Sequence, residues 1–246
     1  MVSMEEDRAL LGARIARVRE RMAQACARVG RDPSEVRLLL ATKTVPVERI
    51  RLAVDAGAHL LGENRIQEAL GKFRDVPEAE WHFIGHLQTN KVRQALEFAK
   101  MIHSVDRPSL VEALDARLRE QGRRLDVLLQ VNTSYEASKF GVEPAGALEL
   151  ARFAAKHDTL RVRGLMTIGP LSDDLDRVRR AYRLLRELRD ELQGTLGDLP
   201  ILSMGMSGDF ELAIEEGATL VRVGTTVFGP RGTSDAEYWP EAGPKA

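Results

Sequence analysis

Lys43 is the residue of this sequence best placed for covalent chemistry. It follows residues 36–42 (VRLLLAT), which are mostly aliphatic or β-branched and predict a strand buried on both faces. In the low dielectric at the end of such a strand the neutral form of an amine is favoured. A neutral amine can attack a carbonyl group and hold it as a Schiff base. The alternative is that Lys43 caps the strand and points into solvent.

Two short segments near the other end of the chain have the composition of an anion-binding site. Ser207-Gly208-Asp209 supplies a hydroxyl and backbone N–H groups at the predicted start of a helix, where negative charge is favoured. Gly224-Thr225, after the last predicted strand, offers a second set of N–H groups. The alternatives are that Ser207 and Asp209 cap a helix and that Gly224 is a turn glycine.

Arg222 is the exception in an otherwise apolar predicted strand, residues 219–223 (TLVRV). A buried guanidinium without an acceptor is costly, so Arg222 requires a partner. That partner is either a neighbouring carboxylate, in a structural ion pair, or part of a ligand. A Schiff-base lysine, an anion site and an interior arginine together describe a pyridoxal phosphate (PLP) site.

The elements that must position these residues alternate regularly. One long amphipathic helix comes first; its apolar stripe is Leu11, Ile15, Val18, Met22, Cys26 and Val29, and Gly30 ends it. Strands are predicted at residues 36–42, 59–62, 81–85, 101–105, 126–132, 161–167, 200–205 and 219–223.

Each predicted strand is followed by a helix or a turn. Eight such units in about 190 residues fit an α/β fold, a single closed (β/α)8 barrel of the TIM type with an extra N-terminal helix. A doubly wound open sheet is the alternative, but such sheets usually stop at about five or six strands.

Composition narrows the class of protein. The chain has 246 residues, a formal net charge of -1, 43% hydrophobic and 30% charged residues, which is ordinary for a soluble protein. The near-zero charge gives no argument for nucleic acid or for a membrane surface as partner. The single cysteine, Cys26, indicates a reducing compartment. We expect one cytoplasmic, monomeric domain over residues 1–231 and a flexible tail over residues 232–246.

Several segments resemble those of a known family. They are ATK ending at Lys43, and GENRIQE, HFIGHLQTNK, SVDRPSL, SKFG, GLMTIGP, LSMGMSGD and VRVGTTVFGPR, in this order between residues 41 and 231. The sequence is similar to the pyridoxal phosphate homeostasis proteins, single-domain relatives of the alanine racemase barrel. The resemblance extends over most of the chain.

The resemblance implies PLP as the cofactor and Lys43 as the Schiff-base lysine. It also implies Ser207, Gly224 and Thr225 around the phosphate and Arg222 at the pyridine nitrogen. The residues that it implies along the rest of the cofactor are Asn64, Met166 and Met206. Lys139, in the loop after the fifth predicted strand, is a second candidate attachment site, and its alternative is a solvated loop lysine.

The histidines do not suggest a metal site, because their spacing forms no ligand cluster. His82 alternates with Trp81 and Phe83 on a predicted strand, so we interpret it as a hydrogen-bonded histidine of the barrel interior. His86 is a candidate for the mouth of the pocket.

Three functions compete. The first is a non-catalytic protein that stores PLP and delivers it, through transient contacts, to PLP-dependent enzymes that lack it. The second is a PLP-dependent amino-acid racemase or decarboxylase, and the third is a Schiff-base aldolase without a cofactor. An arginine at the pyridine nitrogen leaves that nitrogen unprotonated and the ring a poorer electron sink. The racemases related to this family add a second domain with a tyrosine base, and Tyr135, Tyr182 and Tyr238 offer no evident counterpart. We therefore favour the carrier.

Overall fold

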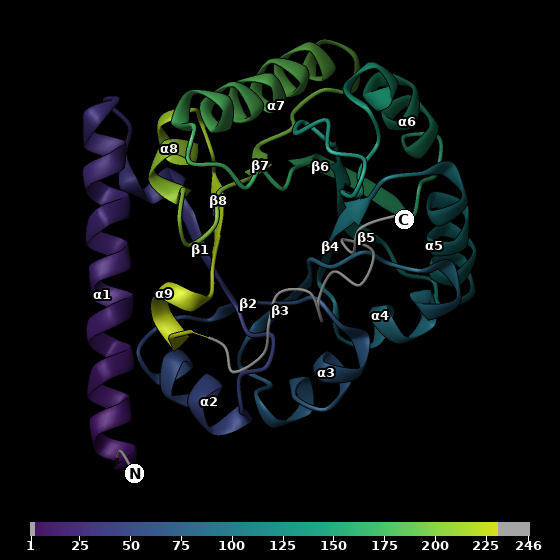
Figure 1. Cartoon of the computed structure of the whole chain (residues 1–246). Coiled ribbons are helices and arrows are strands. Elements are labelled where there is room, and N and C mark those ends of the chain that lie inside the picture. The colour runs from purple at the N-terminus through teal and green to yellow at the C-terminus, as the bar shows by residue number, and fades with distance from the viewer. Residues whose placement is uncertain (1–2, 231–246) are drawn as a thin grey trace, which may run out of the picture.

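The computed structural model describes residues 3–230 and shows a closed barrel of parallel strands in the order β1 to β8 (Figure 1). The strands are β1 (Arg37–Ala41), β2 (Leu60–Glu63), β3 (Glu80–Phe83), β4 (Met101–Val105), β5 (Leu125–Gln130), β6 (Leu160–Met166), β7 (Ile201–Ser203) and β8 (Leu220–Val223). Pairing of β1 with β8 closes the ring. The predicted (β/α)8 barrel is confirmed.

Helices surround the barrel in chain order, as Figure 1 shows. They are α2 (Val47–Asp55), α3 (Ile66–Leu70), α4 (Val92–Phe98), α5 (Pro108–Glu120), α6 (Ala147–Ala154), α7 (Leu175–Leu196), α8 (Phe210–Glu215) and α9 (Thr225–Phe228). Short 3-10 turns lie at Pro33–Glu35, Phe73–Asp75, Thr89–Lys91 and Pro144–Gly146. None of the helices within residues 3–230 has both the length and the apolar character needed to cross a membrane.

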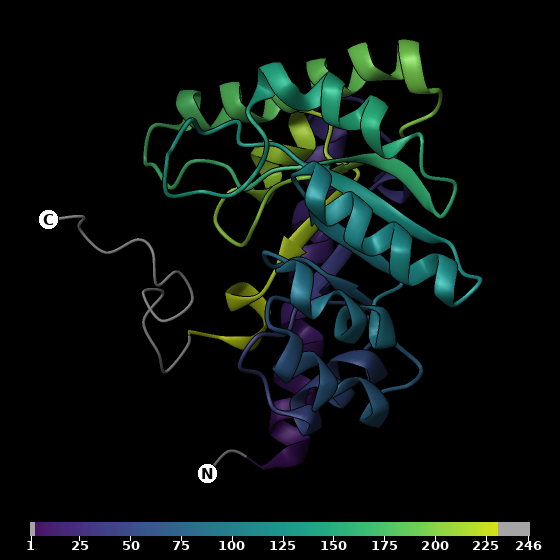
Figure 2. The same cartoon turned by 90° about the vertical axis from the view of Figure 1, so that its right-hand side faces the viewer.

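The extra N-terminal helix, α1 (Met4–Arg28), runs along the outside of the barrel and packs against α2, α8 and α9 (Figures 1 and 2). Its predicted stripe is buried from Leu11 to Cys26, but the prediction is wrong for Val29, which follows the last helical residue and is 43% exposed. Cys26 is fully buried, and burial raises the pKa of its thiol, so it is packed as predicted and unsuited to nucleophilic attack.

The main hydrophobic core lies between the strands and the surrounding helices. Two smaller apolar clusters are separate from it: one of Leu39, Leu60, Ile84 and Leu220, and one of Met101, Leu128 and Met166. Their residues alternate along the strands with residues of the main core, which places the two clusters inside the barrel. The same alternation places His82, Ser203 and Arg222 inside.

Apart from β4, each strand differs from its predicted bounds by one or two residues at one or both ends. The helix after β2 is short and stops at Leu70, because Gly71 ends it. α8 begins at Phe210, after the Ser207-Gly208-Asp209 segment. α9 was not predicted, since a single turn is too short to show helical periodicity. The predicted tail, residues 232–246, lies outside the described residues.

Gly164 on β6 is required by the close approach of β7. Its φ is +149°, and an added Cβ would lie 1.8 Å from the carbonyl oxygen of Ile201. Gly164→Ala should therefore lower the free energy of unfolding by at least about 2 kcal/mol in urea denaturation.

Gly12, in the middle of α1 with open space around it, is the matched control. Gly12→Ala should raise the free energy of unfolding by about 0.5–1 kcal/mol. Equal stability of Gly164→Ala and the unmodified protein would contradict the argument.

Candidate functional site

Closure of the barrel brings Lys43 next to the segment that follows β8. Leu39 pairs with Arg222 and Leu40 with Val223 across the β1–β8 seam. A cavity of about 180 Å³ at this point is lined by Lys43, Gly224 and Thr225, together with residues 44–46, Arg49 and residues 228–230. Lys43 thus shares one cavity with two other predicted site residues, Gly224 and Thr225, which lie more than 180 positions further along the chain.

The turn that carries Lys43 is held on both sides. Lys72 donates to the carbonyl oxygen of Thr42 at 3.0 Å, and Glu68 accepts from the backbone N–H of Thr44 at 2.8 Å. Thr44 has a φ of +61°, which turns the chain sharply after Lys43. These contacts position Lys43 at the mouth of the barrel, and the sequence patterns did not indicate them.

Ser207 connects the loops after β7 and β8. Its Oγ accepts from the backbone N–H groups of Gly224 at 3.1 Å and of Thr226 at 3.4 Å. Thr226 Oγ1 donates back to the Ser207 carbonyl oxygen at 3.3 Å. The Ser207 hydroxyl therefore lies at the start of α9, the part of the site with N–H groups suited to an anion.

Asp209 stabilises the loop after β7 through both of its carboxylate oxygens. One carboxylate oxygen accepts from the backbone N–H of Met206 at 2.6 Å, and the other accepts from the Tyr182 hydroxyl at 2.7 Å. Neither Asp209 nor Ser207 caps α8 with its side chain, so the capping interpretation is wrong for both. Burial, reinforced by the charge and hydrogen bond of Asp209, raises the pKa of Tyr182 well above its usual value.

Arg222 is buried inside the barrel, with 5% of its surface exposed. Its guanidinium donates to Ser203 Oγ and to the carbonyl oxygen of Thr167, both at 2.7 Å. No carboxylate within residues 3–230 forms a salt bridge with it, so the structural ion pair is wrong for the described part of the chain. Burial lowers the pKa of Arg222, which shows how strongly the surroundings disfavour its charge.

The other predicted residues lie at the same end of the barrel without lining the Lys43 cavity. Asn64 follows β2, and its Oδ1 is buried with no hydrogen-bond partner in the described residues. Met166 ends β6 and is fully buried, while Met206 follows β7 and is half-buried. Lys139 donates to the Gly169 carbonyl oxygen at 2.8 Å and contacts Glu136 at 3.1 Å.

The histidines lie in two places. His82 is fully buried and hydrogen-bonded, as predicted. His86 stacks on Phe140, with ring centroids 3.7 Å apart, and lies 3.7 Å from Asp106. Residues 3–230 contain no group of His, Cys, Asp and Glu side chains that could hold a metal ion.

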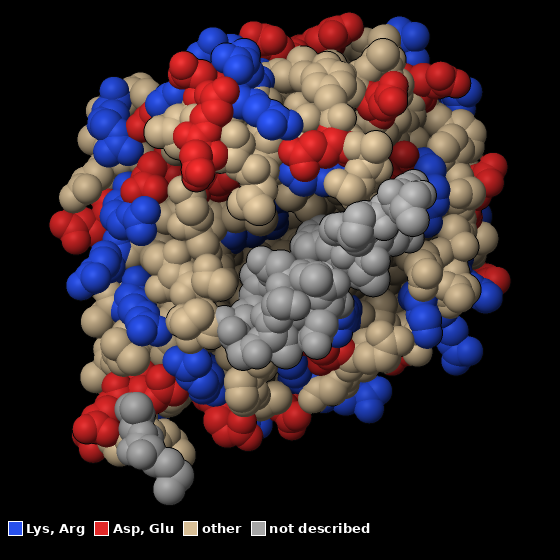
Figure 3. Space-filling view, in the orientation of Figure 1, with Lys and Arg blue, Asp and Glu red and all other residues tan. Residues whose placement is uncertain are grey.

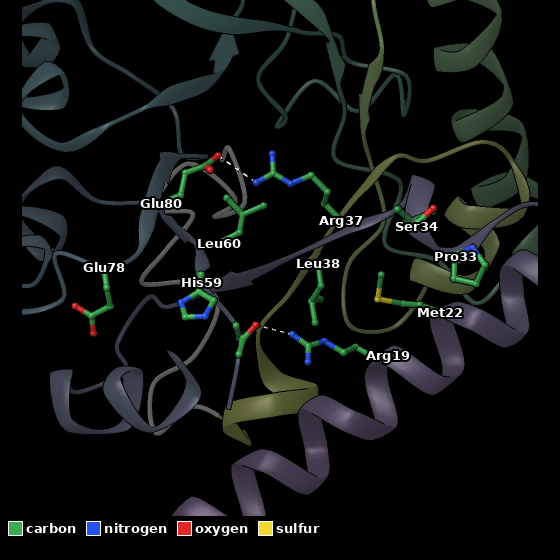
Figure 4. Close-up of a pocket in the computed structure, with 13 residues that line it drawn as sticks. Arg19, Met22, Pro33, Ser34, Arg37, Leu38, His59, Leu60, Glu78 and Glu80 are labelled. Atoms are coloured by element: carbon green, nitrogen blue, oxygen red, sulfur yellow. Dashed lines mark hydrogen bonds and ion pairs between the residues drawn. The ribbon is translucent and has the colours of Figure 1, made fainter. Parts of the chain in front are cut away.

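A larger cavity, of about 640 Å³, lies at the opposite end of the barrel. It is lined by the first residues of β1 and β3, including Arg37 and Glu80, and by Arg19 of α1 (Figure 4). This cavity lies at the start of β1, whereas Lys43 follows the end of β1, so the full length of the strand separates them. Three of the residues predicted to bind the cofactor, Lys43, Gly224 and Thr225, line the smaller cavity and not the larger one.

Comparison with known proteins agrees with this geometry. The model of the family described as "Alanine racemase, N-terminal domain" matches residues 14–232. The pyridoxal phosphate homeostasis protein of Aquifex aeolicus is 48% identical over 221 residues, 89% of this chain and 97% of that protein. The protein of the same name from Escherichia coli K12 is 39% identical over 226 residues, 88% and 95% of the two chains. The chain belongs to the pyridoxal phosphate homeostasis protein family, within the alanine racemase N-terminal domain family.

Solved structures show the same fold in this family. PipY of Synechococcus elongatus, solved with PLP bound, matches with a TM-score of 0.77 and 36% identity, covering 89% of this chain and all of PipY. An alanine racemase of Clostridium difficile, at 10% identity, shares the barrel alone, with a TM-score of 0.74 over 92% of this chain and 58% of the racemase.

Tyr182, which sequence patterns showed only as part of an apolar helix stripe, supports the loop of the site. Tyr182→Phe should lower the free energy of unfolding by about 1.5–3 kcal/mol, because it removes a buried hydrogen bond to a carboxylate. Tyr135, with 72% of its surface exposed, is the matched control, and Tyr135→Phe should change stability by less than about 0.5 kcal/mol. Equal stabilities of the two variants in urea denaturation would show that the Tyr182–Asp209 bond contributes nothing.

Proposed function

We propose that this chain binds PLP covalently through Lys43 and serves in PLP homeostasis by storing and delivering the cofactor. The observation that carries this proposal is the meeting of Lys43, Gly224 and Thr225 in one cavity, beside the buried cation of Arg222. The names of the family members and the PipY structure with PLP bound support the same function.

Each predicted residue has a role in this proposal. Lys43 holds the cofactor as a Schiff base, and the phosphate binds among Ser207, Gly224 and Thr225, where the Ser207 hydroxyl and the Thr225 N–H can donate to it. Arg222 donates to the pyridine nitrogen, and Asn64, Met166 and Met206 line the ring. Bound PLP would supply an aldehyde for the lysine and a conjugated ring that can accept electrons.

Two features of the structure fit this group. The Arg222 guanidinium carries five N–H donors, and the protein contacts described above use two of its nitrogens, Nη1 and Nη2. Asn64 Oδ1 is a buried acceptor without a partner in residues 3–230. Both are polar groups that a bound polar ligand can satisfy at the carboxyl end of the barrel.

We further propose that the protein does not turn over a substrate, in preference to a racemase or decarboxylase. An arginine stays protonated, so it leaves the ring nitrogen unprotonated and weakens the electron sink. A second base is also lacking among the tyrosines of the described residues. Tyr182 is buried and donates to Asp209, and Tyr135 is largely exposed in the loop after β5; Tyr238 lies outside the described residues.

The cofactor-free aldolase fits less well, because it leaves the buried Arg222 without a ligand to bind. Transient delivery to enzymes that lack their PLP, a monomeric state and a cytoplasmic location belong to the proposal as well. The same holds for Lys139 as a second attachment site. Its contacts with Gly169 and Glu136 use ammonium protons, so Lys139 would have to leave both before it could attack an aldehyde.

The attachment site can be tested by reduction. The protein incubated with PLP and then treated with borohydride should gain one pyridoxyl group, found by intact mass and mapped to Lys43. Lys43→Ala should reduce the adduct to background, whereas Lys139→Ala, a matched lysine change at the same end of the barrel, should keep it. An adduct mapped wholly to another lysine would refute the assignment.

The absence of turnover can be tested with the loaded protein. Because a positioned acid or base contributes about 10²–10⁴-fold in rate, a site without a second base should not exceed free PLP. Racemisation and decarboxylation of the common amino acids should therefore proceed at the rate given by an equal concentration of free PLP. Faster reaction of any one amino acid, lost in Lys43→Ala, would establish an enzyme instead.

A further inference from the structure

A continuous chain of hydrogen bonds crosses the barrel interior from Arg222 to the opposite end. Arg222 Nη1 contacts Ser203 Oγ at 2.7 Å, and Ser203 Oγ contacts His103 Nδ1 at 3.0 Å. His103 Nε2 contacts His82 Nδ1 at 2.9 Å, and His82 Nε2 contacts Glu80 Oε1 at 2.8 Å. The chain joins β8, β7, β4 and β3, and its serine and both histidines are fully buried.

The residues at the two ends of this series of hydrogen bonds, Arg222 and Glu80, determine which atom donates in each bond. Arg222 can only donate, so Ser203 Oγ accepts from it and gives its own proton to His103 Nδ1. His103 then donates from Nε2 to His82 Nδ1, and His82 donates from Nε2 to the Glu80 carboxylate. Every member is satisfied in this arrangement, with both histidines neutral and protonated at Nε2.

The Glu80 end of the chain reaches solvent. Glu80 and Arg37 point toward each other across the larger cavity, 3.2 Å apart (Figure 4). The Glu80 side chain is 44% exposed, and its hydrogen bond with His82 helps lower its pKa to about 2. Glu80 is therefore an acceptor at neutral pH, and water in the cavity gives protons a route to His82.

We propose that Ser203, His103 and His82 form a relay that positions the Arg222 guanidinium and couples its surroundings to protonation of the histidine pair. The proposal rests on the proposed function for one step only, namely that Arg222 faces the pyridine nitrogen. When the pair takes up one proton from water, His82 Nδ1 or His103 Nδ1 becomes a donor. The bond to Ser203 must then reverse, and a second positive charge lies next to Arg222.

Electrostatics sets the pH at which this reversal occurs. Burial is the main cause that lowers the pKa of His82 below its ordinary value of 6.5, and it lowers the pKa of His103 further. The charged or titratable groups that act on the pair and on Arg222 are Arg37, Glu80, Asp126, Tyr182 and Asp209. The relay is therefore neutral near pH 7, and the pair takes up a proton at a lower pH than an ordinary histidine does.

The relay itself can be tested without cofactor. In the unloaded protein with ¹⁵N-labelled histidine, long-range ¹H–¹⁵N spectra at pH 7.5 should show both His82 and His103 protonated at Nε2 and unprotonated at Nδ1. Ser203→Ala removes the proton donor to His103 Nδ1, so the ¹⁵N resonance of this nitrogen should move toward that of an unprotonated imidazole nitrogen without a hydrogen bond. Protonation of either histidine at Nδ1 at neutral pH would overturn the proposed direction.

The coupling to Arg222 can be tested with the loaded protein. Its absorbance should change with pH below 6.5, and this change should disappear in Ser203→Ala. Ser104→Ala is the matched control, because Ser104 is equally buried on β4 and its Oγ has no partner within residues 3–230. Ser203→Thr, which keeps the hydroxyl, should restore the pH dependence.

The outcomes separate the relay from the proposed function. An absorbance of Ser203→Ala with the same pH dependence as the unmodified protein would overturn the coupling. Failure of the unmodified protein to bind PLP would refute the proposed function, while the histidine spectra of the unloaded protein would still decide whether the relay exists.

Discussion

The pairing of β1 with β8 is the constraint on which the site depends. This seam sets Leu39 opposite Arg222, and thereby brings Lys43 beside Gly224 and Thr225 at the same edge of the barrel. A piece of the chain that lacks either the first or the last strand would lack one half of this cavity.

The second constraint is the burial of a cation. Arg222 lies inside the barrel with neutral partners, a serine hydroxyl and a backbone carbonyl, and no carboxylate of the described residues pairs with it. Oriented dipoles stabilise such a charge, and here they are the Thr167 carbonyl and the Ser203 hydroxyl, which is hydrogen-bonded to His103. The charge of Asp209 also favours the protonated guanidinium. Arg222 therefore carries a positive charge without a salt bridge at the position where, in the proposal, the pyridine nitrogen of PLP accepts a hydrogen bond. On the face of the molecule shown in Figure 3, charged side chains of both signs are interspersed.

The arrangement fits the proposal that the protein holds its cofactor without turning over a substrate. Three groups that could bind the cofactor lie at this end of the barrel: Lys43, the backbone N–H groups at the start of α9, and the buried guanidinium of Arg222. Among the tyrosines of residues 3–230, Tyr182 donates to Asp209 and Tyr135 is largely exposed, so we do not assign either of them as a second base. Binding that is equally strong before and after reaction stabilises a complex and does not accelerate chemistry.

The sequence by itself determined the strand and helix pattern, the barrel, the place of Lys43 at a strand end and the buried state of His82. These depend on local periodicity and on residues next to each other in the chain. Only the tertiary structure decided the partners: Ser207 on the N–H groups of Gly224, Asp209 on Tyr182, and a chain from Arg222 through Ser203 to His103. His103 carried no sequence signal, because its neighbours come from β3 and β7, and such contacts are set by the stagger of strands around a closed barrel.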